Sequence, residues 1–115
     1  MRNLSKATTI SESDKNLLLE LKSVVTQLVP DARLVVYGSV ARGARQPDSD
    51  YDVLVLTGRR LQSDEYRRLD RAIYDLQLER EAVLSVMVWS QAEWRNPVLK
   101  ASPYRKNVMR EGIAI

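Results

Sequence analysis

The sequence predicts an α/β protein of the α+β kind, in which helices pack on a small mixed β-sheet. Two observations lead to this prediction. Segments with apolar residues at helical spacing alternate with short, apolar, β-branched runs along the chain. A length of 115 residues is also enough for one hydrophobic core and too short for two. We therefore expect a single domain over residues 11–115, preceded by a flexible N-terminus over residues 1–10.

One helix and two strands are predicted in the N-terminal half. A helix begins at Ser11 or Ser13, whose hydroxyl can cap it, and ends at about Val29. The run from Arg33 to Tyr37 is short and β-branched and is followed by a glycine, which is typical of a buried strand. A second strand is predicted over residues 50–57. Too few residues separate the two strands for a full helical crossover, so we expect antiparallel neighbours.

The C-terminal half is predicted to hold a long helix over residues 63–81, capped by Ser63, and a strand over residues 82–89. This helix leaves room for a crossover connection, and the sequence leaves the orientation of the strand open. Short helices over residues 91–95 and 103–110 and an extended end complete the chain. The core positions of the two long helices recur at helical spacing; they are Leu17, Leu18, Leu21, Val24, Val25 and Leu28, then Tyr66, Leu69, Ile73 and Leu76.

Neither cysteine nor histidine occurs in the chain. A disulfide framework and a thiolate metal site are therefore excluded, and so is catalysis by a histidine base or a cysteine nucleophile. Any bound metal must be held by oxygen ligands, which favours Mg²⁺, Mn²⁺ or Ca²⁺ over zinc.

Charge and hydropathy set the expected location and partners. The net charge is +3, and arginines on both sides of an acidic cluster form either a solvated helix face or a surface for phosphate-bearing partners. We expect no direct binding to nucleic acid. The N-terminus lacks the apolar stretch of a secretory signal, and no apolar run is long enough for a membrane helix. We therefore predict a cytoplasmic protein without membrane contact.

An acidic cluster begins the second predicted strand. Asp50 and Asp52 are two positions apart, and alternate residues of a strand point to the same face. Neighbouring carboxylates repel each other unless a cation neutralises them. Mg²⁺ often takes only one or two carboxylates, with water and substrate phosphate completing its ligands. The pair therefore predicts a metal site; the alternative is a pair of ordinary solvated acids.

The turn after the first predicted strand is a candidate phosphate site. Gly38 lets the backbone approach a ligand closely, the Ser39 hydroxyl can donate to a phosphate oxygen, and Arg42 can add a charge-assisted contact. The alternatives are a plain helix cap at Ser39 and an ion pair at Arg42. A phosphate site facing a metal-binding acid pair is typical of nucleotidyl or phosphoryl transfer.

The order of these residues resembles the minimal nucleotidyltransferase branch of the nucleotidyltransferase superfamily. Its pattern is G-S-x-x-R-G, then S-D-x-D and an apolar strand; the matching residues here are Gly38, Ser39, Arg42, Gly43, Ser49, Asp50 and Asp52. The resemblance implies the nucleotidyltransferase fold, ATP as donor and Mg²⁺ or Mn²⁺ as cofactor. It further implies that Asp50 and Asp52 are the catalytic metal ligands and that Gly38 and Ser39 bind the nucleotide phosphates.

Stand-alone members of this branch resemble antitoxins encoded beside a small all-helical toxin of the HEPN ribonuclease type. The resemblance implies a complex with that toxin and transfer of AMP from ATP to one of its tyrosine hydroxyls. One departure matters: the family's third carboxylate aligns with Ser85, and serine is a poor Mg²⁺ ligand. The sequence is therefore also compatible with a protein that binds nucleotide and metal but transfers slowly or not at all.

Three functions remain as hypotheses. The first is a Mg²⁺-dependent adenylyltransferase that acts on a protein acceptor as the antitoxin of a toxin–antitoxin pair. The second is an antitoxin that keeps the fold but acts by binding its toxin alone. The third is a subunit that modifies a small molecule or an RNA end. The sequence leaves open the acceptor residue, the base preference, the general base and the oligomeric state, a homo-oligomer included.

Other residues near the acids have more ordinary interpretations. Asp48 is predicted to be a loop residue, and Tyr51, between the two acids, to face the core on the opposite side of the strand. Arg45 is equally compatible with a phosphate contact and with a structural role. The late aromatic and methionine residues are predicted to close the far edge of the core, with a partner surface as the alternative; they are Trp89, Trp94, Tyr104 and Met109.

Overall fold

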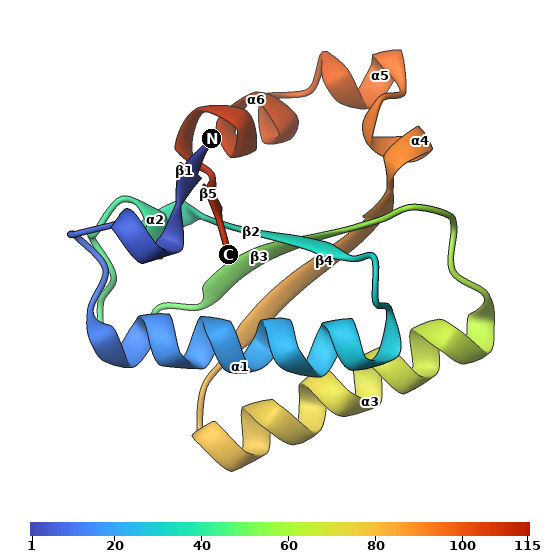
Figure 1. Ribbon diagram of the computed structural model, residues 1–115. Coiled ribbons are helices and arrows are strands. Elements are labelled where there is room, and N and C mark those ends of the chain that lie inside the picture. Colours follow the sequence, from blue (N-terminus) through green and yellow to red (C-terminus); the bar gives the residue numbers. More distant parts are fainter.

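The computed structural model describes all 115 residues and confirms the predicted small mixed sheet with helices packed on it. The sheet has five strands, of which β1 (Arg2–Asn3) was not predicted. Figure 1 shows the arrangement of the elements. In chain order they are β1 (Arg2–Asn3), the 3-10 helix η1 (Leu4–Lys6), α1 (Glu12–Leu28), β2 (Arg33–Tyr37), α2 (Gly38–Ala41), β3 (Tyr51–Thr57), α3 (Ser63–Arg80), β4 (Leu84–Ser90), α4 (Gln91–Trp94), α5 (Pro97–Lys100), α6 (Pro103–Glu111) and β5 (Ile113–Ala114).

The strands lie in the order β1-β5-β2-β3-β4. Strands β2 and β3 are antiparallel, which confirms the prediction from their short connection, and Val35 pairs with Leu54. Strand β4 runs parallel to β3, with Ser85 beside Asp52, because α3 supplies the connection that a parallel pair needs. The orientation that the sequence left open is therefore parallel.

Helices α1 and α3 cover one face of the sheet, which we call the helix face, and α4, α5 and α6 lie on the other side (Figure 1). Side chains alternate along each strand. Val53 and Val55 therefore lie on the helix face and pack in its core, while Leu54 lies on the opposite side of the sheet. The opposite face, called the site face, carries Asp52, Leu54, Ser85 and Trp89.

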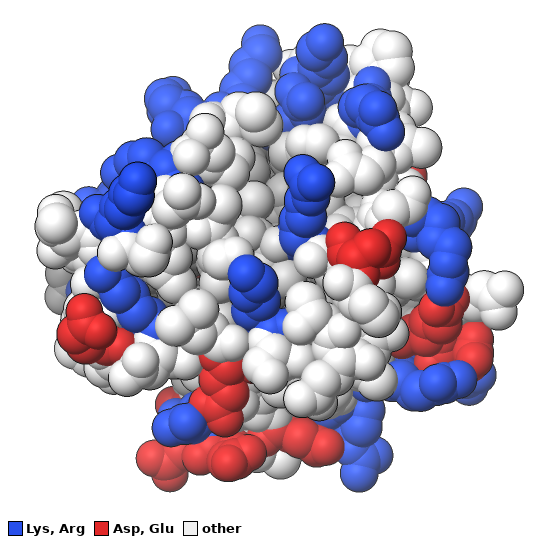
Figure 2. Space-filling model, in the orientation of Figure 1, with Lys and Arg blue, Asp and Glu red and all other residues white.

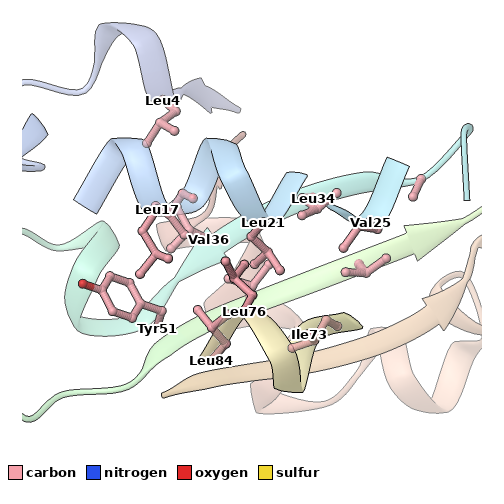
Figure 3. Packing of buried hydrophobic residues seen from close by; sticks show 14 of the residues in the cluster. Leu4, Leu17, Leu21, Val25, Leu34, Val36, Tyr51, Ile73, Leu76 and Leu84 are labelled. Carbon is pink, nitrogen blue, oxygen red and sulfur yellow. The ribbon is translucent and has the colours of Figure 1, made fainter. Parts of the chain in front are cut away.

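The main core fills the space between the sheet and the two long helices. It is a cluster of 21 buried residues, so most of the apolar burial lies on the helix face. Figure 3 shows Leu17, Leu21 and Val25 of α1 beside residues of β2 and α3. The predicted apolar positions of both helices are buried or partly buried here, except Leu28, which is 40% exposed at the end of α1.

Both long helices begin close to the predicted residues. The Asp14 N–H donates to the Ser11 hydroxyl at 3.1 Å, so Ser11 caps α1 as predicted. The cap position of α3 is Gln62 rather than Ser63. The physical reason is the Glu65 carboxylate, which accepts the Gln62 N–H at 2.9 Å and so satisfies a backbone donor one residue earlier than expected.

The N-terminal residues contact the rest of the fold. Arg2 and Asn3 pair in parallel with β5, and Leu4 and Ile10 are buried in the main core. Short-range periodicity cannot reveal this contact, because the partner strand lies at the other end of the chain. The flexibility of residues 1–10 and the domain bounds stay predictions.

Charges are unevenly distributed over the surface. Figure 2 shows the surface in the orientation of Figure 1. Basic residues gather where α5, α6 and β1 lie, and most of the acidic residues lie near α1 and α3. Lys100, Lys106 and Arg110 are exposed in α5 and α6, where Glu111 is the one acid. None of the helices combines the length and apolar character that a membrane span requires.

Candidate functional site

Asp50 and Asp52 lie on the same side of the sheet. Asp50 immediately precedes β3, and Asp52 lies in β3 beside Ser85 of β4. The Ser85 hydroxyl donates to Oδ2 of Asp50 at 2.9 Å, so the residue of β4 that pairs with Asp52 in the sheet also contacts Asp50. The structure thus brings together the two acids that the sequence singled out, on the site face.

The environment of Asp52 disfavours its charged form. Burial raises the pKa of Asp52, and the negative charges of Asp50 and Glu111 raise it further, whereas Arg42 opposes the shift. The stabilisation from protonated Asp52 is therefore present at low pH and lost as the pH rises through its folded-state pKa. A bound cation beside the pair would lower the cost of ionising both carboxylates.

The donor set at the aspartates suits a metal that needs few protein ligands. No group of three or more His, Cys, Asp or Glu side chains could hold a metal ion. Two carboxylates nevertheless fit Mg²⁺, which commonly completes its octahedron with water and substrate phosphate. Ser85, which is predicted to align with the third carboxylate of the resembled family, is not an acid; its hydroxyl donates to Asp50.

The turn at Gly38 lies directly against Asp52. Gly38 opens α2 with φ of +74°, a left-handed conformation that favours glycine. A Cβ at this position would collide with the Asp52 carboxylate. Ser39 follows at a partly buried position in the first turn of α2. Glycine is therefore required here both for the backbone conformation and for the close approach of the turn to Asp52.

The two arginines after this turn point to different places. Nη1 of Arg42 lies 3.1 Å from Oε1 of Glu111, so Arg42 stays beside the turn. The guanidinium of Arg45 instead lies 4.3 Å from the centre of the Tyr51 ring. Tyr51 is only 5% exposed in the main core, as predicted, and its hydroxyl donates to Asp14 at 2.6 Å. These contacts favour the structural role for Arg45.

A cleft of about 520 Å³ opens beside Asp52 on the site face. Three aromatic side chains line it, which suits a planar ligand. The indole N–H of Trp89 is buried there without a hydrogen-bond partner. Burial raises the pKa of Tyr37, whose hydroxyl lies 3.5 Å from that of Tyr104, so this phenol stays protonated at neutral pH. The full lining is Tyr37, Asp52, Ser85, Val86, Met87, Trp89 and Tyr104.

The late aromatic residues divide between core and cleft. Trp94 is 5% exposed and belongs to a small core cluster of the site face, as predicted. Trp89 and Tyr104 pack against that cluster and also line the cleft. Met109 is 50% exposed and does not close the core.

Sequence reasoning missed Glu111, which contacts the turn from the C-terminal end of the chain. Its Oε2 accepts the Gly38 N–H at 3.2 Å across a separation of 73 residues. No local pattern marks this glutamate, since it stands at the end of an ordinary amphipathic helix. The sequence predicts Tyr37 only as the end of a strand, although its position immediately before the Gly38-Ser39 step places it next to the turn.

A family model covers most of the chain. A family model described as a nucleotidyltransferase domain matches residues 18–115. The matched segment contains the acid pair, the Gly38 turn and the cleft residues. No curated protein sequence matches the chain significantly.

Two solved toxin–antitoxin complexes share the fold. A mutant of the MntA–HpeT complex, in which two aspartates two positions apart are changed to glutamate, matches with 15% identity and a TM-score of 0.55 over 84% of this chain and 69% of that one. A toxin–antitoxin structure with AMP-PNP matches with 18% identity and a TM-score of 0.52 over 86% and 69%. A poly(U) polymerase with bound MgGTP gives 30% identity over 61% of this chain and 22% of that one, with a TM-score of 0.43.

Proposed function

This chain belongs to the nucleotidyltransferase domain family, and we propose that it transfers AMP from ATP to a hydroxyl of a protein acceptor in the presence of Mg²⁺. The proposed acceptor is the toxin of a toxin–antitoxin pair, a small all-helical protein of the HEPN type. The observation that carries the proposal is the placement of Asp50 and Asp52 on one face, with Asp52 directly against the Gly38 turn. A cytoplasmic location is part of the same proposal.

Each site residue has a separate task in this proposal. Asp50 and Asp52 would hold the divalent ion, which supplies positive charge against the phosphates when it is bound. The Gly38 N–H and the Ser39 hydroxyl donate to phosphate oxygens, and the Arg42 guanidinium offsets their charge. Gly38 also keeps the turn close to Asp52, because any side chain at this position would displace the carboxylate.

The proposed transfer is a single displacement at phosphorus. The acceptor hydroxyl oxygen forms a bond to the α-phosphorus of ATP, and the bond from that phosphorus to the bridging oxygen of the β-phosphate breaks. Pyrophosphate leaves with the electron pair, and the hydroxyl proton passes to solvent. We assign no side chain as general base: the chain has no histidine, and burial keeps Tyr37 protonated.

The names of the two toxin–antitoxin structures with a similar fold support the proposal. One relative in fold is a toxin–antitoxin complex with AMP-PNP, an ATP analogue. Another is a complex in which two aspartates, spaced as Asp50 and Asp52 are, were both changed to glutamate. Both are consistent with a site in which such a pair faces an adenine nucleotide.

A second candidate is an antitoxin that binds its toxin without modifying it. The observation that favours it is Ser85, which occupies the register position beside Asp52 and is hydrogen-bonded to Asp50. A site with two acids and no third has fewer charges with which to hold metal and nucleotide. Modification of a small molecule or an RNA end is a third candidate, and no observation favours it.

The test uses the purified full chain, Mg²⁺, ATP and the product of the adjacent reading frame as acceptor. ATP labelled at the α-phosphate is compared with ATP labelled at the γ-phosphate, because only the α-label is retained in nucleotidyl transfer. The variants are Asp50→Asn with Asp52→Asn, and the matched control Asp48→Asn, which removes a charge from the exposed loop nearby. Complex formation is followed in parallel by gel filtration.

The proposal expects α-label on the acceptor with the wild type and with Asp48→Asn, and at least about a hundredfold less with the double variant. A tight complex without label, unchanged in the double variant, would replace it with the binding-only antitoxin. Absence of both label and complex would reject both candidates.

A further inference from the structure

A carboxylate of the chain itself occupies the turn to which we assign the nucleotide phosphates. Oε2 of Glu111 accepts the Gly38 N–H at 3.2 Å, and Oε1 lies 3.1 Å from Nη1 of Arg42. Nη2 of Arg110 is 3.7 Å from the same Oε1. Under the proposed function, two of these groups, the Gly38 N–H and the Arg42 guanidinium, bind the nucleotide phosphates. Glu111 therefore holds an anion where the substrate would place one.

The position of Glu111 is fixed by packing on both sides. It is the last residue of α6, and its carbonyl oxygen accepts a hydrogen bond from Nη2 of Arg2 at 3.0 Å. The next residue, Gly112, donates to the Val108 carbonyl at 2.8 Å and has no room for a side chain against Val108 and Val35. The Glu111 side chain is only 15% exposed. The carboxylate is thus held at the turn and does not extend into solvent.

Carboxylate and phosphate oxygens make the same demand on the turn. Each is an anionic acceptor, and the single Gly38 N–H can donate well to only one of them at a time. Arg42 also has to divide its donors between the two anions. A triphosphate that approaches Gly38 therefore meets both an occupied donor and a repelling charge.

We propose that Glu111 is an intramolecular competitor of the nucleotide phosphates at Gly38 and Arg42 and thereby sets the affinity of the site for nucleotide. This inference rests on the proposed function. The contact to Gly38 distinguishes competition from simple positioning of Arg42, because a positioning residue would hold the guanidinium and leave the backbone donor free. Nucleotide binding consequently requires that the Glu111 side chain rotate away from the turn.

The decisive variant is Glu111→Gln. It keeps the size of the side chain and an oxygen that can accept from Gly38, but it removes the charge that competes with phosphate and pairs with Arg42. Binding of a non-hydrolysable ATP analogue with Mg²⁺ should tighten by about tenfold in calorimetry, since charge-assisted hydrogen bonds to the turn no longer have to be broken. Binding of inorganic pyrophosphate alone should tighten in the same direction.

Two further variants make the test specific. Glu79→Gln removes the same charge from an exposed position in α3 and should leave both affinities within about twofold of the wild type. Glu111→Asp keeps the charge on a side chain shorter by one methylene, so it cannot reach Gly38 and Arg42 together and should tighten binding less than Glu111→Gln. Circular dichroism and the urea midpoint show that each variant is folded before binding is measured.

Every outcome bears on the inference. Tighter binding in Glu111→Gln, with Glu79→Gln unchanged, supports it, and binding seen only in Glu111→Gln supports it as well. Equal or weaker binding in Glu111→Gln overturns it and makes Glu111 a positioning residue for Arg42, while the proposed function stands because the wild type still binds. Absence of nucleotide binding in all folded variants rejects both the inference and the nucleotide site.

Discussion

The helix face and the site face of the sheet differ in how completely they are covered. The helix face packs against α1 and α3 and holds most of a 21-residue core cluster, whereas the cluster on the site face has four buried residues. The incompletely covered face carries the cleft, the acid pair and the Gly38 turn.

This difference has a physical cause. A site that binds a charged substrate must keep polar groups accessible and cannot be filled with apolar side chains. Partial burial already raises the pKa of Asp52, so further apolar packing around it would disfavour its charged form more strongly. The residues that stabilise the fold and the residues proposed to act on nucleotide are therefore separated by the thickness of the sheet, and variants of the two faces should affect different measurements.

The largest effect on stability is expected on the helix face. Leu21→Ala removes a fully buried side chain from α1 and should lower the free energy of unfolding by about 3 kcal/mol, because it loses apolar burial and leaves a cavity. Urea unfolding measures the loss. Leu19→Ala, at a half-exposed position of the same helix, should stay within about 0.5 kcal/mol of the wild type. Nucleotide affinity of folded Leu21→Ala should be unchanged; a large loss would show that the faces are coupled.

An intermediate effect is expected at the turn of the site face. Gly38→Ala forces a side chain into a left-handed conformation, which costs about 1–2 kcal/mol, and pushes its Cβ against the Asp52 carboxylate. Both stability and nucleotide binding should therefore fall, as followed by urea unfolding and calorimetry. Gly38→Asn separates the two causes, because asparagine tolerates this conformation better: it should recover part of the stability but not the binding. Retained binding in both variants would remove Gly38 from the site.

The smallest effect is expected away from the core and the cleft, where Arg59 of the loop before α3 pairs with Glu65 in the first turn of that helix. The carboxylate of Glu65 accepts two hydrogen bonds from Arg59, at 2.8 and 2.6 Å, and this contact lowers the pKa of Glu65 to about 2. A lowered folded-state pKa stabilises the fold above the unfolded value of 4.5 and ceases to do so as the pH falls toward 2.

Glu65→Gln should therefore flatten the decline of the urea midpoint between about pH 5 and about pH 2, by a small amount because the pair is exposed to solvent. Binding of nucleotide at neutral pH should not change. If the wild type and the variant decline in parallel, the ion pair makes no net contribution to stability.

Local patterns predicted the elements that form the site. The strand at Arg33–Tyr37 has the predicted bounds, Ser11 caps α1, and the antiparallel pairing of β2 with β3 follows from the short connection. The spacing of Asp50 and Asp52 correctly placed both side chains on one side of the sheet. The assignment of metal and phosphates to these residues stays a proposal.

The sequence by itself determined the two long helices, the main strands and the two short motifs, because periodicity and turn chemistry act between residues that are close along the chain. Only the tertiary structure decided that β4 lies parallel to β3, so that Ser85 meets Asp50, and that α6 returns to place Glu111 on Gly38. Such contacts join residues from distant parts of the chain. They depend on how whole elements pack, which no local spacing encodes.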